Sequence, residues 1–265
     1  MRGTDSGGYR AAMPEPGAAV LLPRPLSGRV YESGRRIRLG DVDVDGRCRL
    51  DALVRYLQDV ARDDSADSGL PDPMGWVVRR TMLEVRTAPV FQEWVSLATW
   101  CSGYGGRWAE RRTEVVGDGG ARVEAVTLWV RVDQATGRPV KLSDEFFELY
   151  GEACAGRTVS ARTRLDTDPG PATDVEPWPV RFADLDVLAH VNNAAQWVAV
   201  EEALDRVGGC PPPLVAELEH GPGVERDTDV RLHWRAVDGG ADTWLTTDGV
   251  AGSVARVRPL GQASL

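Results

Sequence analysis

At residues 180–193 the chain reads VRFADLDVLAHVNN, a strand-like run followed by an acidic turn and the expected start of a helix. A related stretch, IRLGDVDVDGRC, lies at residues 37–48. The two stretches share a pair of aspartates at one constant offset of 143 residues: Asp41 and Asp43 in the first, Asp184 and Asp186 in the second. Only the second has a histidine, His190, which stands where the first has Arg47. The chain is therefore predicted to be a duplication whose chemistry is concentrated in its second half.

The composition indicates a globular protein and excludes several classes. The chain has 265 residues, 42% of them hydrophobic, and nine tryptophans, which suits one large domain or two small ones. Its formal net charge of −9 gives no basis for sequence-independent binding to nucleic acid, which needs a basic surface. No run approaches the apolar length of a membrane span. We therefore expect no nucleic-acid partner and no membrane span.

The four cysteines are widely spaced and form no C-x-x-C pair. This usage predicts reduced thiols in a cytoplasmic protein, and neither a metal site nor a cofactor is expected. Residues 1–26 are rich in Gly, Ala and Pro and are predicted to form a flexible N-terminal tail.

The first half of the chain predicts one strand, one helix and then four antiparallel strands. Residues 28–39 are strand-like, and the apolar side chains of the next segment recur at helical spacing: Leu50, Leu53, Val54, Leu57, Val60 and Ala61. The helix is expected to end within residues 65–75, which contain Gly69, Pro71 and Pro73. Strands are then expected, between turn signals, at Trp76–Arg86, Trp94–Ser102, Arg107–Val116 and Arg122–Val132.

The second half predicts the same order of elements. After a connecting helix at residues 143–155 and a loop at Asp166–Pro179, a strand is expected at Pro179–Ala183 and a helix at residues 193–207. Four more strands are expected at Leu214–His220, Thr228–Ala236, Asp242–Thr247 and Val250–Arg258. The predicted fold class is α+β, with two tandem repeats that each wrap a curved antiparallel β-sheet around a long helix. The expected divisions are residues 1–26 for the tail, 27–142 for the first repeat, 143–178 for a linker and 179–265 for the second repeat.

These features resemble the acyl-acyl-carrier-protein thioesterases, a family of plant and bacterial enzymes with a tandem double-hotdog fold. Residues 184–193, DLDVLAHVNN, resemble the family signature D-L-D-V-N-x-H-V-N-N, and segments 53–61, 76–80 and 126–130 resemble the family's first hotdog. The similarity runs from about Val30 to Arg258. It implies a double hotdog and a thioesterase that hydrolyses acyl groups carried by acyl-carrier protein, or by coenzyme A, in fatty-acid biosynthesis.

The resemblance also implies the site residues. Asp186 and His190 match the family's catalytic aspartate and histidine. Two positions depart from the family pattern, since Leu188 stands where the family has a catalytic asparagine and Gly223 where it has a catalytic glutamate. Glu225 is a substitute acid if the strand register shifts. The four-residue site of the family is thus reduced to two residues in this chain.

The chemistry of the residues supports the same pair. Thioester hydrolysis needs an activated water molecule and donors for the carbonyl oxygen, and the start of a helix supplies unpaired N–H groups. Asp186 and His190 flank such a start, so one can activate water while the other moves a proton. Asn192 and Asn193 are expected as helix N-caps that support the oxyanion site. The plainer alternatives are a turn role for Asp186, a solvent-facing role for His190 and a structural role for Asp184.

Two functional classes stay open on the sequence alone. One is the hydrolase. The other is a hotdog protein that binds acyl thioesters, or acts on them as a hydratase or cyclase, because Leu188 and Gly223 lack the expected polar groups. The tryptophans of the predicted strands form either an acyl tunnel or plain core: Trp76, Trp94, Trp100, Trp108 and Trp129. A tandem repeat already supplies the pairing of single-hotdog proteins, so a monomer and a homodimer are both compatible with the sequence.

Overall fold

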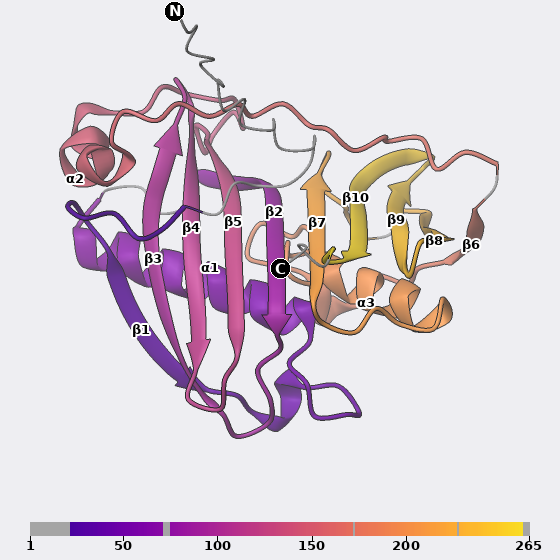
Figure 1. Cartoon of the computed structure of the whole chain (residues 1–265). Coiled ribbons are helices and arrows are strands. Elements are labelled where there is room, and N and C mark those ends of the chain that lie inside the picture. Colours follow the sequence, from indigo (N-terminus) through magenta and orange to yellow (C-terminus); the bar gives the residue numbers. More distant parts are fainter. Residues whose placement is uncertain (1–21, 71–74, 172, 227, 262–265) are drawn as a thin grey trace, which may run out of the picture.

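One continuous antiparallel sheet organises the computed structural model, which describes residues 22–70, 75–171, 173–226 and 228–261. The strand order is β1-β3-β4-β5-β2-β7-β10-β9-β8-β6 (Figure 1). The first-half strands are β1 (Tyr31–Arg36), β2 (Trp76–Thr87), β3 (Trp94–Tyr104), β4 (Trp108–Gly117) and β5 (Arg122–Arg131). The second-half strands are β6 (Asp174–Pro177), β7 (Leu214–His220), β8 (Val230–Val237), β9 (Gly240–Thr247) and β10 (Val250–Pro259). Each half of the chain therefore builds its own half of the sheet.

The two halves join where β2 pairs with β7. In this antiparallel pairing Met82 lies opposite Glu217. The two residues are also equivalent positions of the repeats, because the strands of the second half follow those of the first at an offset of 135 residues. A residue that pairs with its own equivalent marks a local two-fold axis. The repeats are therefore related to each other as the subunits of a symmetric dimer are.

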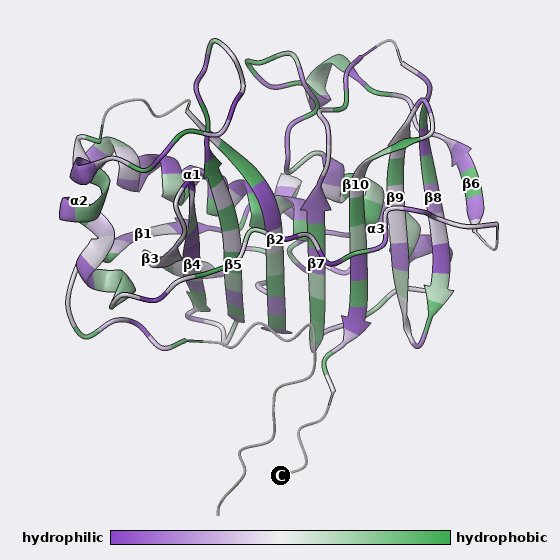
Figure 2. Cartoon of the chain, turned by 90° about the horizontal axis from the view of Figure 1, so that it is seen from above, coloured by the Kyte–Doolittle hydropathy of each residue, from purple (hydrophilic) through white to green (hydrophobic). Residues whose placement is uncertain are grey.

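Both main helices pack on the same face of the sheet. Helix α1 (Leu50–Ser68) lies behind the first-half strands and α3 (Gln196–Arg206) behind the second-half strands (Figure 1). Leu53 of α1 and Trp197 of α3 belong to one buried core cluster that includes strand residues of both halves. Apolar and polar residues alternate along the strands (Figure 2), as in a sheet with one face on a core. The predicted α+β fold class is confirmed.

The linker between the repeats is bound to the opposite face of the sheet. Glu219, which follows a core residue of β7, points to that face. Its carboxylate accepts the backbone N–H groups of Arg164 and Leu165 at 2.9 and 3.0 Å. The indole N–H of Trp244 donates to the carbonyl of Asp166 at 2.8 Å. The linker thus crosses the sheet from α2 (Asp144–Cys154) to β6 as a packed segment (Figure 1).

Two predicted elements of the second half are wrong, and a third, the helix, is present with shorter bounds. The strand at Pro179–Ala183 is absent, because Phe182–Asp184 forms a 3-10 turn in which the Asp184 carboxylate accepts the N–H of Arg181 at 2.8 Å. The loop predicted at Asp166–Pro179 contains β6, which pairs with β8 at the sheet edge. The second helix is also short, since α3 has 11 residues where α1 has 19. It begins after a separate turn at residues 193–195 rather than at residue 193.

Other expectations concern the whole chain. Residues 1–21 of the predicted tail, and residues 71–74 within the predicted helix end, lie outside the described residues. No helix in the described ranges is both long and apolar enough to cross a membrane. The four cysteines are free thiols, and all are buried.

Candidate active site

The second aspartate of each acidic turn holds that turn closed. One carboxylate oxygen of Asp186 accepts the N–H groups of Leu188, at 2.9 Å, and of His190, at 3.4 Å. In the first repeat, Asp43 accepts two N–H groups at the equivalent positions, at 2.9 and 2.8 Å. The second oxygen of Asp186 has no hydrogen-bond partner among the described residues. The turn role is therefore common to both repeats, and it leaves one oxygen of Asp186 available to a water molecule.

Asp184 has a structural environment. It is 7% exposed, and its carboxylate binds both the N–H and the guanidinium of Arg181. Its backbone carbonyl accepts the N–H of Asn192 at 2.8 Å, which ties the acidic turn to the start of α3. The equivalent Asp41 accepts the N–H of Arg38 in the same way, at 2.9 Å. These contacts match the structural alternative for Asp184.

His190 lies beside Gly223, at the position where the family has a glutamate. A Cβ atom added to Gly223 would lie 3.3 Å from Nδ1 of the imidazole, so a side chain at residue 223 would contact the ring. The backbone of Glu225 is bridged to that of His190, and the Glu225 carboxylate lies 3.9 Å from Nε2. Both side chains are substantially exposed, 46% for His190 and 66% for Glu225. The structure thus brings His190 together with the acid that the sequence suggested as a substitute.

The two asparagines do different things at the start of α3. The side-chain oxygen of Asn192 accepts the N–H of Ala194 at 2.8 Å, and its carbonyl accepts the N–H of Gln196 at 3.2 Å. Asn192 therefore caps the turn that opens the helix. The N–H of Asn193 has no acceptor among the described residues, and Asn193 lines a narrow cavity of about 190 Å³ between the repeats. An N–H group at a helix start without an acceptor in the protein is a donor available to a ligand.

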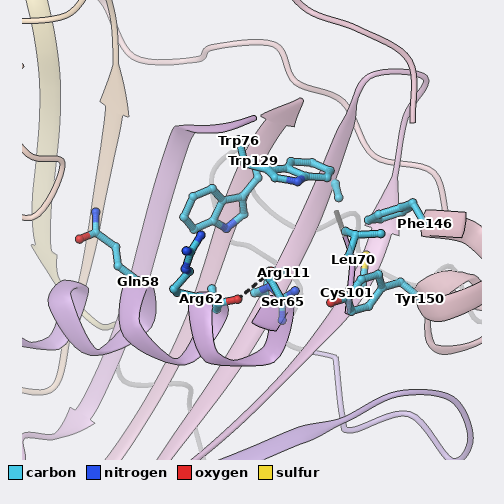
Figure 3. A pocket seen from close by; sticks show the side chains of 12 residues that line it. Gln58, Arg62, Ser65, Leu70, Trp76, Cys101, Arg111, Trp129, Phe146 and Tyr150 are labelled. Carbon is cyan, nitrogen blue, oxygen red and sulfur yellow. Dashed lines mark hydrogen bonds between the residues drawn. The ribbon is translucent and has the colours of Figure 1, made fainter. Parts of the chain in front are cut away.

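A larger hollow extends along α1 from this cavity. It holds about 600 Å³ of empty space, part of which is open to solvent. In Figure 3, Gln58 lies at one end of it, and Phe146 and Tyr150 of α2 lie at the other. The narrow cavity and the hollow share Gln58 and Trp129 as lining residues. The two hollows are therefore neighbours, one lined by Asn193 at the start of α3 and the other reaching α2.

The lining of the hollow is mixed. Of the tryptophans proposed for an acyl tunnel, Trp76 and Trp129 line it, whereas Trp100 is 2% exposed and belongs to the core. Near the α2 end, Arg111 is paired with the buried carboxylate of Asp64 at 2.6 Å, and the Tyr150 hydroxyl donates to the same carboxylate at 3.0 Å. The α2 end of the hollow is thus polar, and the charge of Arg111 there is balanced by that of Asp64.

The other two histidines are packed away from this chemistry. Nδ1 of His220 lies 3.1 Å from the side-chain oxygen of Gln196, and burial lowers the pKa of His220 to about 3. His220 is therefore neutral at physiological pH. His233 contacts the hydroxyl of Thr246 at 3.2 Å, and its pKa is also lowered by partial burial.

Gln58 is the residue of this region that the sequence reasoning missed. It lies on α1, 135 positions before Asn193, so no local motif joins the two. One signal was present. Val54, Gln58 and Ala61 follow one another at helical spacing, so Gln58 interrupts the apolar stripe that packs α1 on the sheet. A polar residue within such a stripe indicates a cavity or a specific partner.

Comparison with known proteins agrees with this architecture. Family models match two parts of the chain, the acyl-ACP thioesterase N-terminal domain at residues 28–150 and the acyl-ACP thioesterase C-terminal domain at residues 170–248. The chain belongs to the acyl-ACP thioesterase family. An uncharacterized protein of Mycobacterium tuberculosis is 29% identical over 220 residues, which cover 83% of this chain and 88% of that protein.

Solved structures place this acyl-ACP thioesterase family member in the double-hotdog fold. A Lactobacillus plantarum protein described as an oleoyl thioesterase has a TM-score of 0.75 at 22% identity, over 88% of this chain and 96% of the other. The 12:0-ACP thioesterase of Umbellularia californica has a TM-score of 0.71 at 22% identity, over 88% of this chain and 98% of the other. The fold expected from the sequence resemblance is therefore confirmed, and family membership supports acyl-thioester hydrolysis.

Proposed function

We propose that the protein hydrolyses acyl thioesters carried by acyl-carrier protein or coenzyme A to free acids, with Asp186 and His190 as the catalytic pair. The observation that carries the proposal is the pair of neighbouring hollows, one lined by Asn193 and the other lying along α1. Asp186 and His190 belong to the turn that leads to Asn193. An acyl chain that fills the hollow directs its thioester toward that turn.

The proposed reaction uses groups at the start of α3. The free carboxylate oxygen of Asp186 takes a proton from water, and the water oxygen attacks the thioester carbon. The N–H of Asn193, at the positive end of α3, donates to the carbonyl oxygen as it becomes negative. The C–S bond then breaks, and protonated His190 gives a proton to the departing thiolate. The proton held by Asp186 returns to His190, which leaves a free acid, a thiol and the enzyme in its starting state.

The two departures from the family pattern, Leu188 and Gly223, remove polar side chains from the site but leave Asp186 and His190 in place. Leu188 is 52% exposed on the turn and offers no side-chain hydrogen bond. Glu225 takes the place of the missing glutamate in the proposal, because its carboxylate lies 3.9 Å from Nε2 of His190. A cytoplasmic location also belongs to the proposal, and the four free thiols are compatible with it.

A panel of acyl-carrier-protein and coenzyme A thioesters of increasing chain length tests the proposal. Purified protein should release free thiol from at least one member, measured with a thiol-reactive dye. Tight binding of panel members without any turnover would replace the hydrolase with an acyl-binding or non-hydrolytic hotdog protein. The absence of both binding and turnover would reject both functions.

A further inference from the structure

A side chain from the middle of α3 reaches the start of α1. The carboxylate of Glu201 accepts the N–H of Leu50, the first residue of α1, at 2.5 Å. Burial raises the pKa of the Glu201 carboxyl to about 7. The start of α1 is therefore already occupied by an oxygen atom from the other repeat.

The repeat relation places Gln58 and Asn193 in the matching arrangement at the start of α3. Gln58 on α1 is the equivalent of Glu201, and Asn193 is the equivalent of Leu50, at the same offset as the two acidic turns. Gln58 and Asn193 line one narrow cavity. Neither the Gln58 side-chain amide nor the Asn193 N–H is hydrogen-bonded to a described residue. The hydrogen bond between Glu201 and the N–H of Leu50 at the start of α1 therefore has no counterpart between Gln58 and Asn193 at the start of α3.

The exchange of a carboxylate for an amide decides what each position can bind. An ionised glutamate only accepts hydrogen bonds, so it binds the helix N–H and repels a second anionic oxygen. A glutamine also has two N–H donors. In the narrow cavity, the Gln58 amide and the Asn193 N–H can therefore both donate to one oxygen atom. The equivalent N–H of Leu50, which holds an oxygen of Glu201, shows that this geometry accepts an oxygen ligand.

We propose that Gln58 is a catalytic residue that, together with the N–H of Asn193, donates a hydrogen bond to the carbonyl oxygen of the thioester. The inference rests on the proposed hydrolysis and extends it to a group from the first repeat. Because Gln58 lines both cavities, it lies where the carbonyl group meets the acyl chain. The chain then runs along α1 toward Phe146 and Tyr150 (Figure 3). The active site is thus built across the two repeats.

Kinetics of Gln58 variants test this role. Gln58→Leu keeps the bulk of the side chain but removes its donors, and kcat should fall by about 10²-fold or more with a smaller change in KM. Gln58→Glu copies the first repeat, so its activity should be low at neutral pH and recover partly as the pH falls, because a protonated carboxyl donates. Glu201→Gln is the matched control and should retain wild-type kcat. Thermal unfolding midpoints show whether each variant is folded.

A binding experiment separates this inference from the proposed hydrolysis. Two pantetheine probes are compared by calorimetry: an acyl ketone in which CH₂ replaces the thioester sulfur, and an alkyl thioether without a carbonyl group. The wild type should bind the ketone more tightly, and Gln58→Leu should lose that preference. A wild type without the preference, or a Gln58→Leu variant that keeps it, overturns the carbonyl contact whatever happens to turnover. A wild type that hydrolyses no thioester but prefers the ketone through Gln58 overturns the proposed function alone.

Discussion

The starts of α1 and α3 are equivalent points of the duplicated chain, yet they differ in what they can bind. At the start of α1, the N–H of Leu50 is satisfied by the carboxylate of Glu201. At the start of α3, the N–H of Asn193 has no acceptor among the described residues, and Asn193 lines a cavity together with Gln58. The same backbone therefore supplies two potential sites. One pair of side chains, Glu201 and Gln58, closes the first and leaves the second open.

The acidic turns before these helices show which residues are informative. Asp43 and Asp186 accept the same pair of backbone N–H groups, so an aspartate at this position is explained by the turn alone. The turns differ at the next functional position, where Arg47 is replaced by His190 beside Gly223. Comparison of the repeats thus separates what the backbone needs from what the proposed chemistry needs. Each of the following predictions contrasts the two copies.

The largest effect is expected from Asp186→Asn. An asparagine oxygen can still accept the turn N–H groups, but it is a very weak base, so kcat should fall by about 10³-fold, within the usual contribution of a general base. Asp43→Asn makes the same change in the first repeat and should leave kcat unchanged. The measurement is thiol release from the best substrate of the panel. Equal effects of the two substitutions would remove the catalytic role of Asp186.

Glu201→Gln should change how stability depends on pH. Since burial raises the pKa of Glu201 from 4.5 to about 7, the folded protein holds a proton that the unfolded chain releases in this window. The wild type should therefore lose stability as the pH rises through the window, and the variant should not. Across the window, the free energy of unfolding of the wild type should fall by on the order of 3 kcal/mol relative to that of the variant. Urea unfolding at several pH values measures it.

Glu202→Gln provides the control for this experiment. The side chain of Glu202 is 49% exposed and pairs with Arg206, so its removal should produce no comparable pH-dependent difference. A pH-independent difference for Glu201→Gln would show that Glu201 is not a buried acid closing the start of α1.

His190→Ala should lower kcat by about 10²-fold, because the departing thiolate then lacks its proton donor. Arg47→Ala, the equivalent change in the first repeat, should have no effect on kcat. The rate should be compared between thioesters and activated thiophenyl esters, whose leaving groups need no proton. A loss of the same size with both kinds of ester would contradict the role of His190 as an acid.

The smallest effect is expected from Leu188→Asn, which restores the family's amide. Because Leu188 is 52% exposed, the substitution needs no repacking of the core. A side-chain donor beside Asp186 should raise kcat severalfold. The same assay measures it, with Val187→Asn, a neighbouring exposed position, as the control. A lower rate for Leu188→Asn than for the wild type would show that the site is adapted to leucine.

The order of elements follows from local patterns and could be predicted from the sequence. The strand predicted at Leu214–His220 coincides with β7, and the other strands predicted in the two meanders agree with the structure to within two residues at either end. Alternating apolar residues and glycine-rich turns act over a few positions, so they are visible without tertiary contacts. The failures lie in the linker, where β6 depends on β8 for its pairing, and in the segment before α3, where the carboxylate of Asp184 closes a turn.

The acidic turn carries its signature in neighbouring residues, so Asp186 and His190 were accessible as candidates from the sequence. The resemblance to the family rests on this stretch together with segments 53–61, 76–80 and 126–130. The place of Gln58 beside a cavity was not accessible, since Gln58 and Asn193, which line the same cavity, are 135 positions apart in the sequence. The place of Gly223 against the imidazole likewise required the backbone contacts of Val224 and Glu225 with residues 190–191.

The sequence by itself determined that the chain is duplicated, that each copy has an acidic turn before a helix, and that only one copy has the histidine. The tertiary structure decided which helix start is closed and which is open. The physical reason is that each start is completed by a side chain from the opposite repeat. Only the antiparallel pairing of β2 with β7 brings Glu201 to Leu50 and Gln58 to the cavity of Asn193.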